Sequence, residues 1–288
     1  MYDTAVIGGG PAAMSAALNL KIRNKNFIIL AGTDEATDLS KAPNIENYLG
    51  INNISGKDLL HTFEKHLKEM GIQKKKQMAY NILDMGDYFT INAGNNFYDT
   101  KTIIIATGKA RTKLLEGEEA YLGRGVGYCA TCDGPLYRNK TVAIVSENRE
   151  GEEEARFMGE ICSKVYYLPL YKTDMFNSRN IIVLNGKPMS VVGNGDKVTS
   201  LLTSEGNIDV DAVFFIRGVL PVNQLIDGLE LEDGSIKVDK SMATSIPGVF
   251  ACGDCTGKPF QIAKAVGEGN IAALSVARYL DKTSEMEA

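Results

Sequence analysis

Residues 2–13 read Tyr-Asp-Thr-Ala-Val-Ile-Gly-Gly-Gly-Pro-Ala-Ala, and this stretch decides the fold that we expect. The apolar run over residues 2–7 predicts a strand, the three glycines predict a tight turn, and the small residues from Pro11 to about Leu20 predict a helix. A second strand is predicted over residues 27–30. A strand, a helix and a second strand in this order predict a βαβ unit.

The glycine turn fits the pattern G-x-G-x-x-A between a strand and a helix. Glycines at these positions let the backbone approach a pyrophosphate, and the helix N-terminus supplies unpaired N–H donors. The residues that we expect to bind a dinucleotide here are Gly8, Gly10, Pro11, Ala12 and Ala13. The alternative is a tight strand-to-helix turn that binds no ligand. Ala31 and Gly32 follow the second strand where a ribose-binding carboxylate is usual, so ribose recognition must differ.

A second unit of the same kind begins at Thr141. Residues 142–145 predict a short buried strand, a helix follows from about Gly151, and another strand is predicted over residues 165–168. Shorter strands are predicted further on, and a long helix of small residues is predicted from Gln261 to Leu280. We therefore expect an α/β fold of two Rossmann-like, three-layer ββα dinucleotide-binding-type domains, the second inserted into the first. The predicted boundaries are 1–112 with 219–288 for the first domain and 113–218 for the second.

Composition narrows the classes of function. The chain has 288 residues, of which 44% are hydrophobic and 23% charged, as in ordinary globular proteins. Its net charge of −5 argues against a nucleic-acid binder, which normally carries a basic excess. We see no apolar run of about 18 residues and no basic-then-apolar leader, so we expect a cytoplasmic protein without a membrane partner.

The cysteines point to thiol chemistry. An odd number, five, argues against a framework of structural disulfides in a protein without an export signal. Cys129 and Cys132 form a C-x-x-C motif, in which one thiolate can attack an external disulfide and the other can resolve the mixed disulfide. A neighbouring carboxylate, Asp133, can carry the proton. The alternatives are two packed cysteines or half of a zinc site, whose other half would have to be Cys252 and Cys255. We expect no metal site, and we interpret Cys162 as a core residue.

Two further segments carry a family resemblance. Ala106, Thr107 and Gly108 follow an apolar strand, and residues 248–254 read Gly-Val-Phe-Ala-Cys-Gly-Asp. Together with the first glycine turn, they resemble the three FAD fingerprints of the flavoproteins that have two dinucleotide-binding domains. The resemblance covers nearly the whole chain and implies FAD as the cofactor, with Asp254 at its ribityl or phosphate region.

The redox motif narrows the resemblance. Cys-Ala-Thr-Cys-Asp-Gly over residues 129–134 is similar to the active-site motif of low-molecular-weight thioredoxin reductases, and residues 45–48, 137–139 and 261–269 support this match. The resemblance implies that Cys132 faces the flavin, that Cys129 exchanges with thioredoxin, that Asp133 is the acid/base and that the protein is a homodimer. The further FAD-binding residues that it implies are Asn47, Ala106, Thr107, Gly108, Gly253, Asp254, Gln261, Ile262 and Ala263.

The inserted domain departs from the ordinary members of that family. It lacks a glycine motif for NADPH, and residues 146–154 instead read Ser-Glu-Asn-Arg-Glu-Gly-Glu-Glu-Glu. Five carboxylates are therefore expected where a pyrophosphate would bind, and they would repel it. No arginine follows the next strand to bind a 2′-phosphate, and Lys172 is a weak substitute. The pattern resembles the pyridine-nucleotide-independent subgroup, in which reduced ferredoxin supplies the electrons.

Three alternatives remain open. The protein could be a conventional NADPH-dependent thioredoxin reductase, a flavin-bound redox sensor without turnover, or a reductase of the ferredoxin–nucleotide type, whose members lack the cysteine pair. Ferredoxins are normally acidic, so their docking favours a basic patch. The candidates for this patch are Lys74, Lys75, Lys76, Lys101, Lys109, Arg111 and Lys113.

Overall fold

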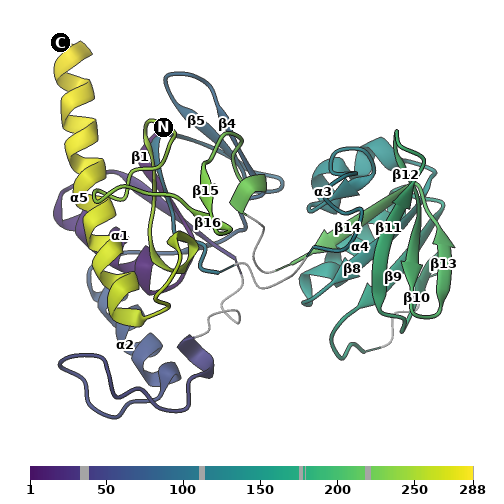
Figure 1. Ribbon diagram of the computed structural model, residues 1–288, viewed down its shortest axis with the longest axis horizontal. Coiled ribbons are helices and arrows are strands. Elements are labelled where there is room, and N and C mark those ends of the chain that lie inside the picture. The colour runs from purple at the N-terminus through teal and green to yellow at the C-terminus, as the bar shows by residue number, and fades with distance from the viewer. Residues whose placement is uncertain (33–38, 110–113, 175–177, 179, 218–221, 288) are drawn as a thin grey trace. The chain divides into compact units, whose positions relative to one another are not determined.

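The computed structural model describes residues 1–32, 39–109, 114–174, 178, 180–217 and 222–287. The chain divides into two compact units (Figure 1). The discontinuous unit comprises Met1–Ala110 and Val219–Ala288, and the inserted unit comprises Arg111–Gly218. Each unit is described by itself.

A seven-stranded sheet forms the centre of the discontinuous unit. Its parallel part has the order β3-β2-β1-β6, with β17 also on β6. The bounds of these strands are β1 Tyr2–Ile7, β2 Phe27–Ala31, β3 Lys75–Lys76, β6 Phe97–Ile105 and β17 Val249–Ala251. The antiparallel strands β4 (Asn81–Asp84) and β5 (Phe89–Asn92) complete the sheet. The first half of β6 pairs with β5 and its second half pairs with β17, so one strand joins the two parts.

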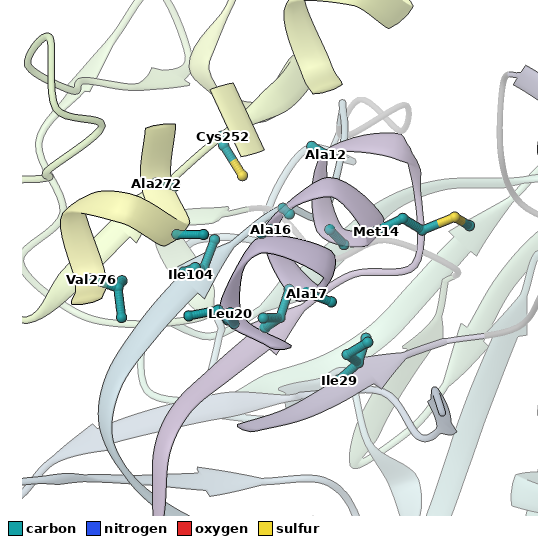
Figure 2. Close-up of a cluster of buried hydrophobic side chains, with 14 of the residues drawn as sticks. Ala12, Met14, Ala16, Ala17, Leu20, Ile29, Ile104, Cys252, Ala272 and Val276 are labelled. Atoms are coloured by element: carbon teal, nitrogen blue, oxygen red, sulfur yellow. The ribbon is translucent and has the colours of Figure 1, made fainter. Parts of the chain in front are cut away.

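Alternate residues of the central strands serve opposite faces of this sheet, as the two-residue period of a strand requires. Val6, Ile29 and Ile104 belong to one cluster with residues of two helices, α1 (Pro11–Ile22) and α5 (Ile262–Glu287). Figure 2 shows Ile29 and Ile104 among the side chains of this cluster. Ala5 and Ile7 belong to a second cluster, which includes Phe89 and Ile91 of β5 and Leu225. The sheet is therefore covered on both faces.

Helices α1 and α5 pack at backbone distance. A Cβ added to Gly269 of α5 would lie 2.2 Å from the carbonyl oxygen of Ala12 in α1. Helix α2 (Gly56–Glu69) is capped by Ser55, whose Oγ accepts a hydrogen bond of 3.1 Å from the Asp58 N–H. The remaining short elements are η2 Leu39–Lys41, η4 Val222–Gln224, η5 Gly253–Thr256, and the hairpin of β15 Leu231–Glu232 and β16 Ser235–Ile236.

The inserted unit has a parallel sheet in the order β10-β9-β8-β14-β7. Its strands are β7 Val126–Gly127, β8 Thr141–Ser146, β9 Lys164–Pro169, β10 Ile181–Val183 and β14 Ala212–Ile216. Helix α4 (Glu150–Ile161) connects β8 to β9, while α3 (Ala130–Asp133) and η3 (Gly134–Tyr137) follow β7. A separate antiparallel sheet contains β11 Pro188–Gly193, β12 Val198–Thr203 and β13 Gly206–Asp209.

The predicted fold class is confirmed, since both units have parallel sheets connected by helices. The predicted βαβ units are confirmed at β1-α1-β2 and at β8-α4-β9. One element differs in length: α5 continues to Glu287, beyond the predicted end at Leu280. In the part of the chain that the structure describes, the helices are all too short or too polar to span a membrane.

Candidate active site

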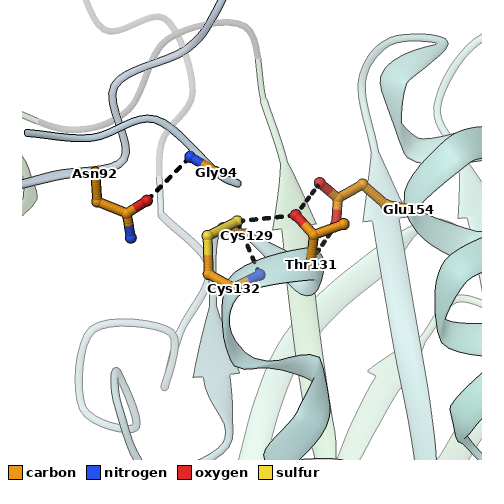
Figure 3. Close-up of a disulfide and its surroundings, with 6 residues drawn as sticks. All are labelled: Asn92, Gly94, Cys129, Thr131, Cys132 and Glu154. Carbon is orange, nitrogen blue, oxygen red and sulfur yellow. Dashed lines mark hydrogen bonds between the residues drawn. A yellow bond between two sulfur atoms is a disulfide. The ribbon is translucent and has the colours of Figure 1, made fainter. Parts of the chain in front are cut away.

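Cys129 and Cys132 form a disulfide at the start of α3, with their Cα atoms 5.3 Å apart (Figure 3). Cys129 occupies the N-cap position of this helix, where its sulfur accepts a hydrogen bond of 3.1 Å from the Cys132 N–H. The predicted pair therefore lies where one sulfur receives a backbone donor that would also stabilise a thiolate. Cys129 is 4% exposed, whereas Cys132 is half-buried.

Close packing of α3 and η3 on α4 fixes this turn. A Cβ added to Gly134 would lie 2.5 Å from the sulfur of Met158 in α4, so a side chain there would force Met158 to shift. Ala130 and Met158 are fully buried in the same cluster. The redox turn is thus packed closely against α4 of the inserted unit.

A carboxylate from α4 contacts the redox turn. Glu154 is 7% exposed, and its Oε2 accepts a hydrogen bond of 2.8 Å from the Thr131 N–H. The Thr131 hydroxyl lies 3.4 Å from Glu154 Oε1 and 3.3 Å from Cys129 Sγ, so it bridges the two groups (Figure 3). Burial raises the pKa of Glu154, although hydrogen bonds from Thr131 lower it in part.

Sequence reasoning missed this contact. It placed Glu154 among five carboxylates that face a pyrophosphate position, and for Glu154 that prediction is wrong, because the side chain points to α3 instead. Glu152 lies in the first turn of α4, as predicted, and its Oε1 accepts hydrogen bonds of 3.0 Å from the Tyr171 hydroxyl and 2.8 Å from the Thr173 hydroxyl. No spacing in the sequence could have distinguished the buried Glu154 from the carboxylates around it.

Asp133 is the last residue of α3 and is exposed. One of its oxygens lies 3.0 Å from the point that a Cβ on Gly127 would occupy, so the glycine leaves room for the carboxyl group. Desolvation by the surrounding protein raises the pKa of Asp133 above its ordinary value, which suits a group that exchanges protons with the redox pair.

The turn after β8, where a nucleotide would bind in an ordinary domain of this type, is filled by its own contacts. The Asn148 side chain accepts a hydrogen bond of 3.0 Å from the Glu150 N–H, and Ser146 Oγ donates one of 2.6 Å to the Asn148 carbonyl. A Cβ added to Gly151 would lie 2.2 Å from Ser146 Oγ, which shows how tightly this turn closes. Acidic side chains in the first turn of α4 add negative charge.

A buried ion pair lies at the end of β14. Arg217, which is 4% exposed, bonds to the fully buried Glu118, and its Nε lies 3.4 Å from Glu147. Tyr128 donates a hydrogen bond of 2.7 Å to Glu118. Burial alone would lower the pKa of Arg217, but its bond to Glu118 outweighs this and raises the pKa. The guanidinium is therefore engaged by carboxylates rather than directed at a phosphate, a feature that the sequence did not reveal.

The first glycine turn of the discontinuous unit requires glycine. Gly8 has a φ of +129°, and a Cβ there would lie 2.1 Å from the Ala106 carbonyl oxygen. Gly10 precedes α1 without a side-chain cap, Pro11 opens the helix, and nothing lies within 4 Å of the position of a Gly10 Cβ. The turn therefore presents uncapped backbone N–H groups in open space.

The segment after β6 lies beside this turn. The Ala106 N–H donates a hydrogen bond of 2.8 Å to the Ile7 carbonyl, and Gly108 has a φ of +75° with open space around it. In the part of the chain that the structure describes, the buried Thr107 Oγ1 has no hydrogen-bond partner. A buried hydroxyl without a partner beside a glycine turn is suited to a polar ligand.

The third predicted segment reaches the same helix. A Cβ on Gly253 would lie 2.8 Å from the Cβ of Ala12, and the half-buried Asp254 follows in η5. The Gly253 N–H donates to Glu268 at 2.9 Å, and Lys264 donates to the Gly253 carbonyl at 2.9 Å. Sequence reasoning had quoted Lys264 and Glu268 only as part of a matching run and had assigned them no role.

The remaining predicted residues are Asn47 and the three residues around the start of α5. The Asn47 amide donates a hydrogen bond of 2.8 Å to Gln261 Oε1, although the two residues are far apart in the sequence. Ile262 opens α5 and Ala263 follows it. Through Ala12, the structure brings the first turn, including Ala13, together with Gly253; it joins Asn47 to Gln261 separately.

Comparison with known proteins identifies the family of the chain. Residues 2–269 match the model of the pyridine nucleotide-disulphide oxidoreductases. The chain belongs to this family. A thioredoxin reductase from Ureaplasma parvum is 33% identical over 99% of this chain and 98% of its own length.

Solved structures of related family members are also similar. A ferredoxin-flavin thioredoxin reductase from Clostridium acetobutylicum is 47% identical, with a TM-score of 0.88 over 98% of both chains. A second ferredoxin-flavin thioredoxin reductase structure from that organism is 44% identical, with a TM-score of 0.92 over 98% of both chains.

Thioredoxin reductases of this family are FAD flavoproteins. The discontinuous unit fits that cofactor, because uncapped N–H groups, glycine turns and the unpartnered Thr107 hydroxyl lie around the start of α1. The prediction of FAD as the cofactor is therefore supported by the family and by the chemistry of the residues present.

The other three cysteines are free thiols and are buried. Burial raises the pKa of Cys162 to about 11 and that of Cys255 to about 12, and it raises the pKa of Cys252 strongly. The prediction that Cys162 is a core residue is confirmed. The described part of the chain contains no group of three or more His, Cys, Asp or Glu side chains suited to a metal ion.

Proposed function

We propose that the chain is a thioredoxin reductase in which FAD passes electrons to the Cys129–Cys132 disulfide, with reduced ferredoxin as the electron donor. The observation that carries the proposal is the disulfide on the turn of α3, in a chain that belongs to a family of flavin-dependent disulfide oxidoreductases. When bound, FAD supplies a redox group that can accept electrons from a donor and deliver two to a disulfide.

The proposed FAD site is built from three segments of the discontinuous unit. Gly8 and Gly10 allow the backbone to approach the pyrophosphate, and the N-terminus of α1 supplies N–H donors. Thr107 supplies a free hydroxyl. The complete set proposed for FAD is Gly8, Gly10, Pro11, Ala12, Ala13, Asn47, Ala106, Thr107, Gly108, Gly253, Asp254, Gln261, Ile262 and Ala263.

At the redox turn, residues of the chain stabilise the thiolate and exchange its proton. The Cys132 N–H stabilises a thiolate on Cys129, and Asp133 exchanges protons as the acid/base. The resemblance assigned exchange with thioredoxin to Cys129. Its 4% exposure does not favour that assignment in the described conformation, in which the half-buried Cys132 is the more accessible sulfur.

Ferredoxin as the donor is supported by the inserted unit. The turn after β8 bonds to itself and carries acidic side chains, and Arg217 is engaged by Glu118 and Glu147, so neither favours a nucleotide phosphate. The similar proteins from Clostridium acetobutylicum are named for ferredoxin and flavin.

The proposed basic docking patch is supported in part. Lys74 pairs with Glu64 at 2.8 Å, while Lys109 lies over the ring of Phe260 and Lys75 over that of Tyr98, so these three cations already have neighbours. Lys75, Lys76 and Lys101 are exposed. Arg111 and Lys113 lie outside the described residues. We propose the exposed lysines as the part of the patch that meets an acidic partner.

Anaerobic reduction of the flavin tests the donor. The purified protein is mixed with excess NADPH in one cuvette and with reduced ferredoxin in another, and the absorbance near the flavin maximum is followed. We expect bleaching by ferredoxin and none by NADPH. Rapid bleaching by NADPH would return the chain to the conventional NADPH-dependent enzymes. Bleaching by ferredoxin without reduction of thioredoxin would indicate a flavin-bound sensor.

We also propose that the protein acts in the cytoplasm as a homodimer. Sedimentation of the flavin-loaded protein at several concentrations tests the dimer, and a single species of monomer mass would contradict it.

A further inference from the structure

One buried carboxylate of the inserted unit has no role in the function proposed above. Glu154 lies on α4 beneath the redox turn and is 7% exposed. Its two oxygens have different partners: Oε2 accepts from the Thr131 N–H at 2.8 Å, and Oε1 faces the Thr131 hydroxyl at 3.4 Å. The hydrogen bond from the Thr131 N–H holds the backbone of the turn, whereas the Thr131 hydroxyl also lies close to Cys129 Sγ.

The Thr131 hydroxyl has two possible acceptors and one hydrogen to donate. It lies 3.3 Å from Cys129 Sγ and 3.4 Å from Glu154 Oε1. When the carboxylate is ionised, it competes for the hydroxyl hydrogen; when it is protonated, the hydrogen is free for sulfur. The protonation of one group therefore affects the other through a single side chain.

Disulfide exchange requires Cys129 to change its protonation. The dithiol reduces an external disulfide in two steps: one motif sulfur attacks as a thiolate and releases a partner thiolate, and the other re-forms the Cys129–Cys132 bond and releases the second partner thiolate. Both motif protons are lost to the surrounding acceptors, and the two partner thiolates take up two protons in turn. Whichever sulfur attacks first, Cys129 must lose its proton before the bond re-forms.

We propose that Glu154 is a positioning residue of the redox pair, which acts through the Thr131 hydroxyl to govern the release and return of the Cys129 proton. The inference rests on the proposed disulfide exchange and adds a second carboxylate to Asp133. Asp133 lies at the exposed end of α3, whereas Glu154 lies on the buried side of its first turn.

The charges around Glu154 support a group that changes its protonation. Burial has the largest effect and raises the pKa of Glu154, and the negative charge of Glu150 on the same helix raises it further. From α3, the backbone N–H groups of Ala130 and Thr131 and the Thr131 hydroxyl lower it. The carboxyl group is thus more easily protonated than an exposed glutamate but retains enough hydrogen bonds to ionise.

Titration of a single sulfur tests the proposal without a partner protein. In the FAD-loaded Cys132→Ser variant, Cys129 is the one thiol of the motif, and because it is 4% exposed, its pKa is measured without a reagent, from the pH dependence of the NMR chemical shift of its Cβ. Adding Glu154→Gln removes the charge but keeps an oxygen that can accept from the Thr131 N–H. The Thr131 hydroxyl lies 3.3 Å from Cys129 Sγ and 3.4 Å from Glu154 Oε1, so the Glu154 charge acts on Cys129 across two short contacts. We expect the loss of this charge to lower the pKa of Cys129 by about 1 to 2 units.

Two further variants separate this role from a structural one. Glu153→Gln removes an exposed charge one residue away on α4 and should leave the Cys129 pKa within about 0.3 units of the parent, since exposed charges are well screened. Thr131→Val keeps the backbone N–H but removes the hydroxyl, so the shift caused by Glu154→Gln should be smaller in that background.

An unchanged Cys129 pKa in a folded Glu154→Gln variant that retains FAD would overturn the proposal, because a purely structural tether survives that substitution. An equal shift with and without the Thr131 hydroxyl would overturn the path through Thr131. Failure of the proposed function is recognised separately, as a wild-type protein that does not reduce thioredoxin although the shift in the Cys129 pKa is present.

Discussion

The two glycines of α5 near its start offer a direct test of how the FAD-binding unit is packed. Gly267 and Gly269 lie two residues apart on one helix, but nothing lies within 4 Å of a Cβ on Gly267, whereas a Cβ on Gly269 would lie 2.2 Å from the Ala12 carbonyl oxygen and 3.0 Å from the Ser15 Cβ. Each Gly→Ala substitution gains about 1 kcal/mol of helix propensity. Only Gly269→Ala also forces α1 away from α5.

The difference between the two variants isolates the cost of the contact, because the gain in propensity is common to both. An added methyl group in a packed interior costs about 1 to 3 kcal/mol, and a 2.2 Å approach to a backbone atom that cannot rotate away favours the upper part of that range. We therefore expect Gly267→Ala to be about 1 kcal/mol more stable than wild type, and Gly269→Ala to be about 2 to 3 kcal/mol less stable than Gly267→Ala.

Thermal unfolding of the flavin-free proteins, followed by circular dichroism, measures this difference. For a unit of this size, about 2 to 3 kcal/mol corresponds to a difference in Tm of roughly 4 to 12 °C. Because α1 carries the glycine turn at its start, Gly269→Ala should also retain less FAD after gel filtration. Equal stability and equal FAD content in the two variants would refute the close packing of α1 and α5.

Three other expectations follow from the inserted unit and the thiols. Cys129→Ser and Cys132→Ser should each abolish reduction of thioredoxin while the flavin still accepts electrons. Because Cys132 is the more exposed sulfur, Cys129→Ser should form more mixed disulfide than Cys132→Ser with a thioredoxin that lacks its resolving cysteine. A higher yield from Cys132→Ser would instead assign the exchange to Cys129. At pH 8 the reduced protein should take up alkyl groups only on the redox pair, with the half-buried Cys132 reacting faster than the 4% exposed Cys129, since burial raises the pKa of Cys162 to about 11 and of Cys255 to about 12 and that of Cys252 strongly; a label on Cys162, Cys252 or Cys255 under native conditions would contradict this. Because the folded-state pKa of Glu154 is raised, the contribution of this group to stability is fully present below its ordinary pKa of about 4.5 and is lost as the pH rises through the folded-state pKa. The stability of Glu154→Gln relative to wild type, measured by urea unfolding, should therefore increase between pH 4 and pH 7. A difference that stays constant with pH would contradict the raised pKa.

Much of the architecture could be predicted from the sequence, because the patterns that carry it are local. The strand over residues 2–7, the glycine turn and the helix from Pro11 are encoded within about twenty residues, and the structure has them at β1 and α1. The Cys129–Cys132 pair is equally local, since its two members are three residues apart. Alternating burial on β5, with Phe89 and Ile91 inside, likewise follows from a two-residue period.

The contacts that sequence reasoning missed join residues that are distant in the chain. Thr131 and Glu154 are separated by 23 positions, and Arg217 and Glu118 by 99. Their pairing depends on which helix lies against α3 and on which strand ends beside residue 118, and neither fact has a sequence period. The end of α5 was missed for another reason: beyond Leu280 the helix is polar, so no apolar pattern marks its length.

The pairing of β6 with β17 affects the order in which the two units can fold during synthesis. Its partners β1 and β5 lie before or beside it in the sequence, but β17 pairs with it only after the whole inserted unit has been synthesised, and α5, which packs on α1, comes later still. At about 5 to 20 residues per second, the inserted stretch of roughly a hundred residues takes about 5 to 20 s to emerge. During that interval the apolar face of β1 and β6 that α5 will cover is exposed on the nascent chain, while the inserted unit can already complete its own sheet. The redox turn can therefore be folded before the unit that we propose to bind FAD.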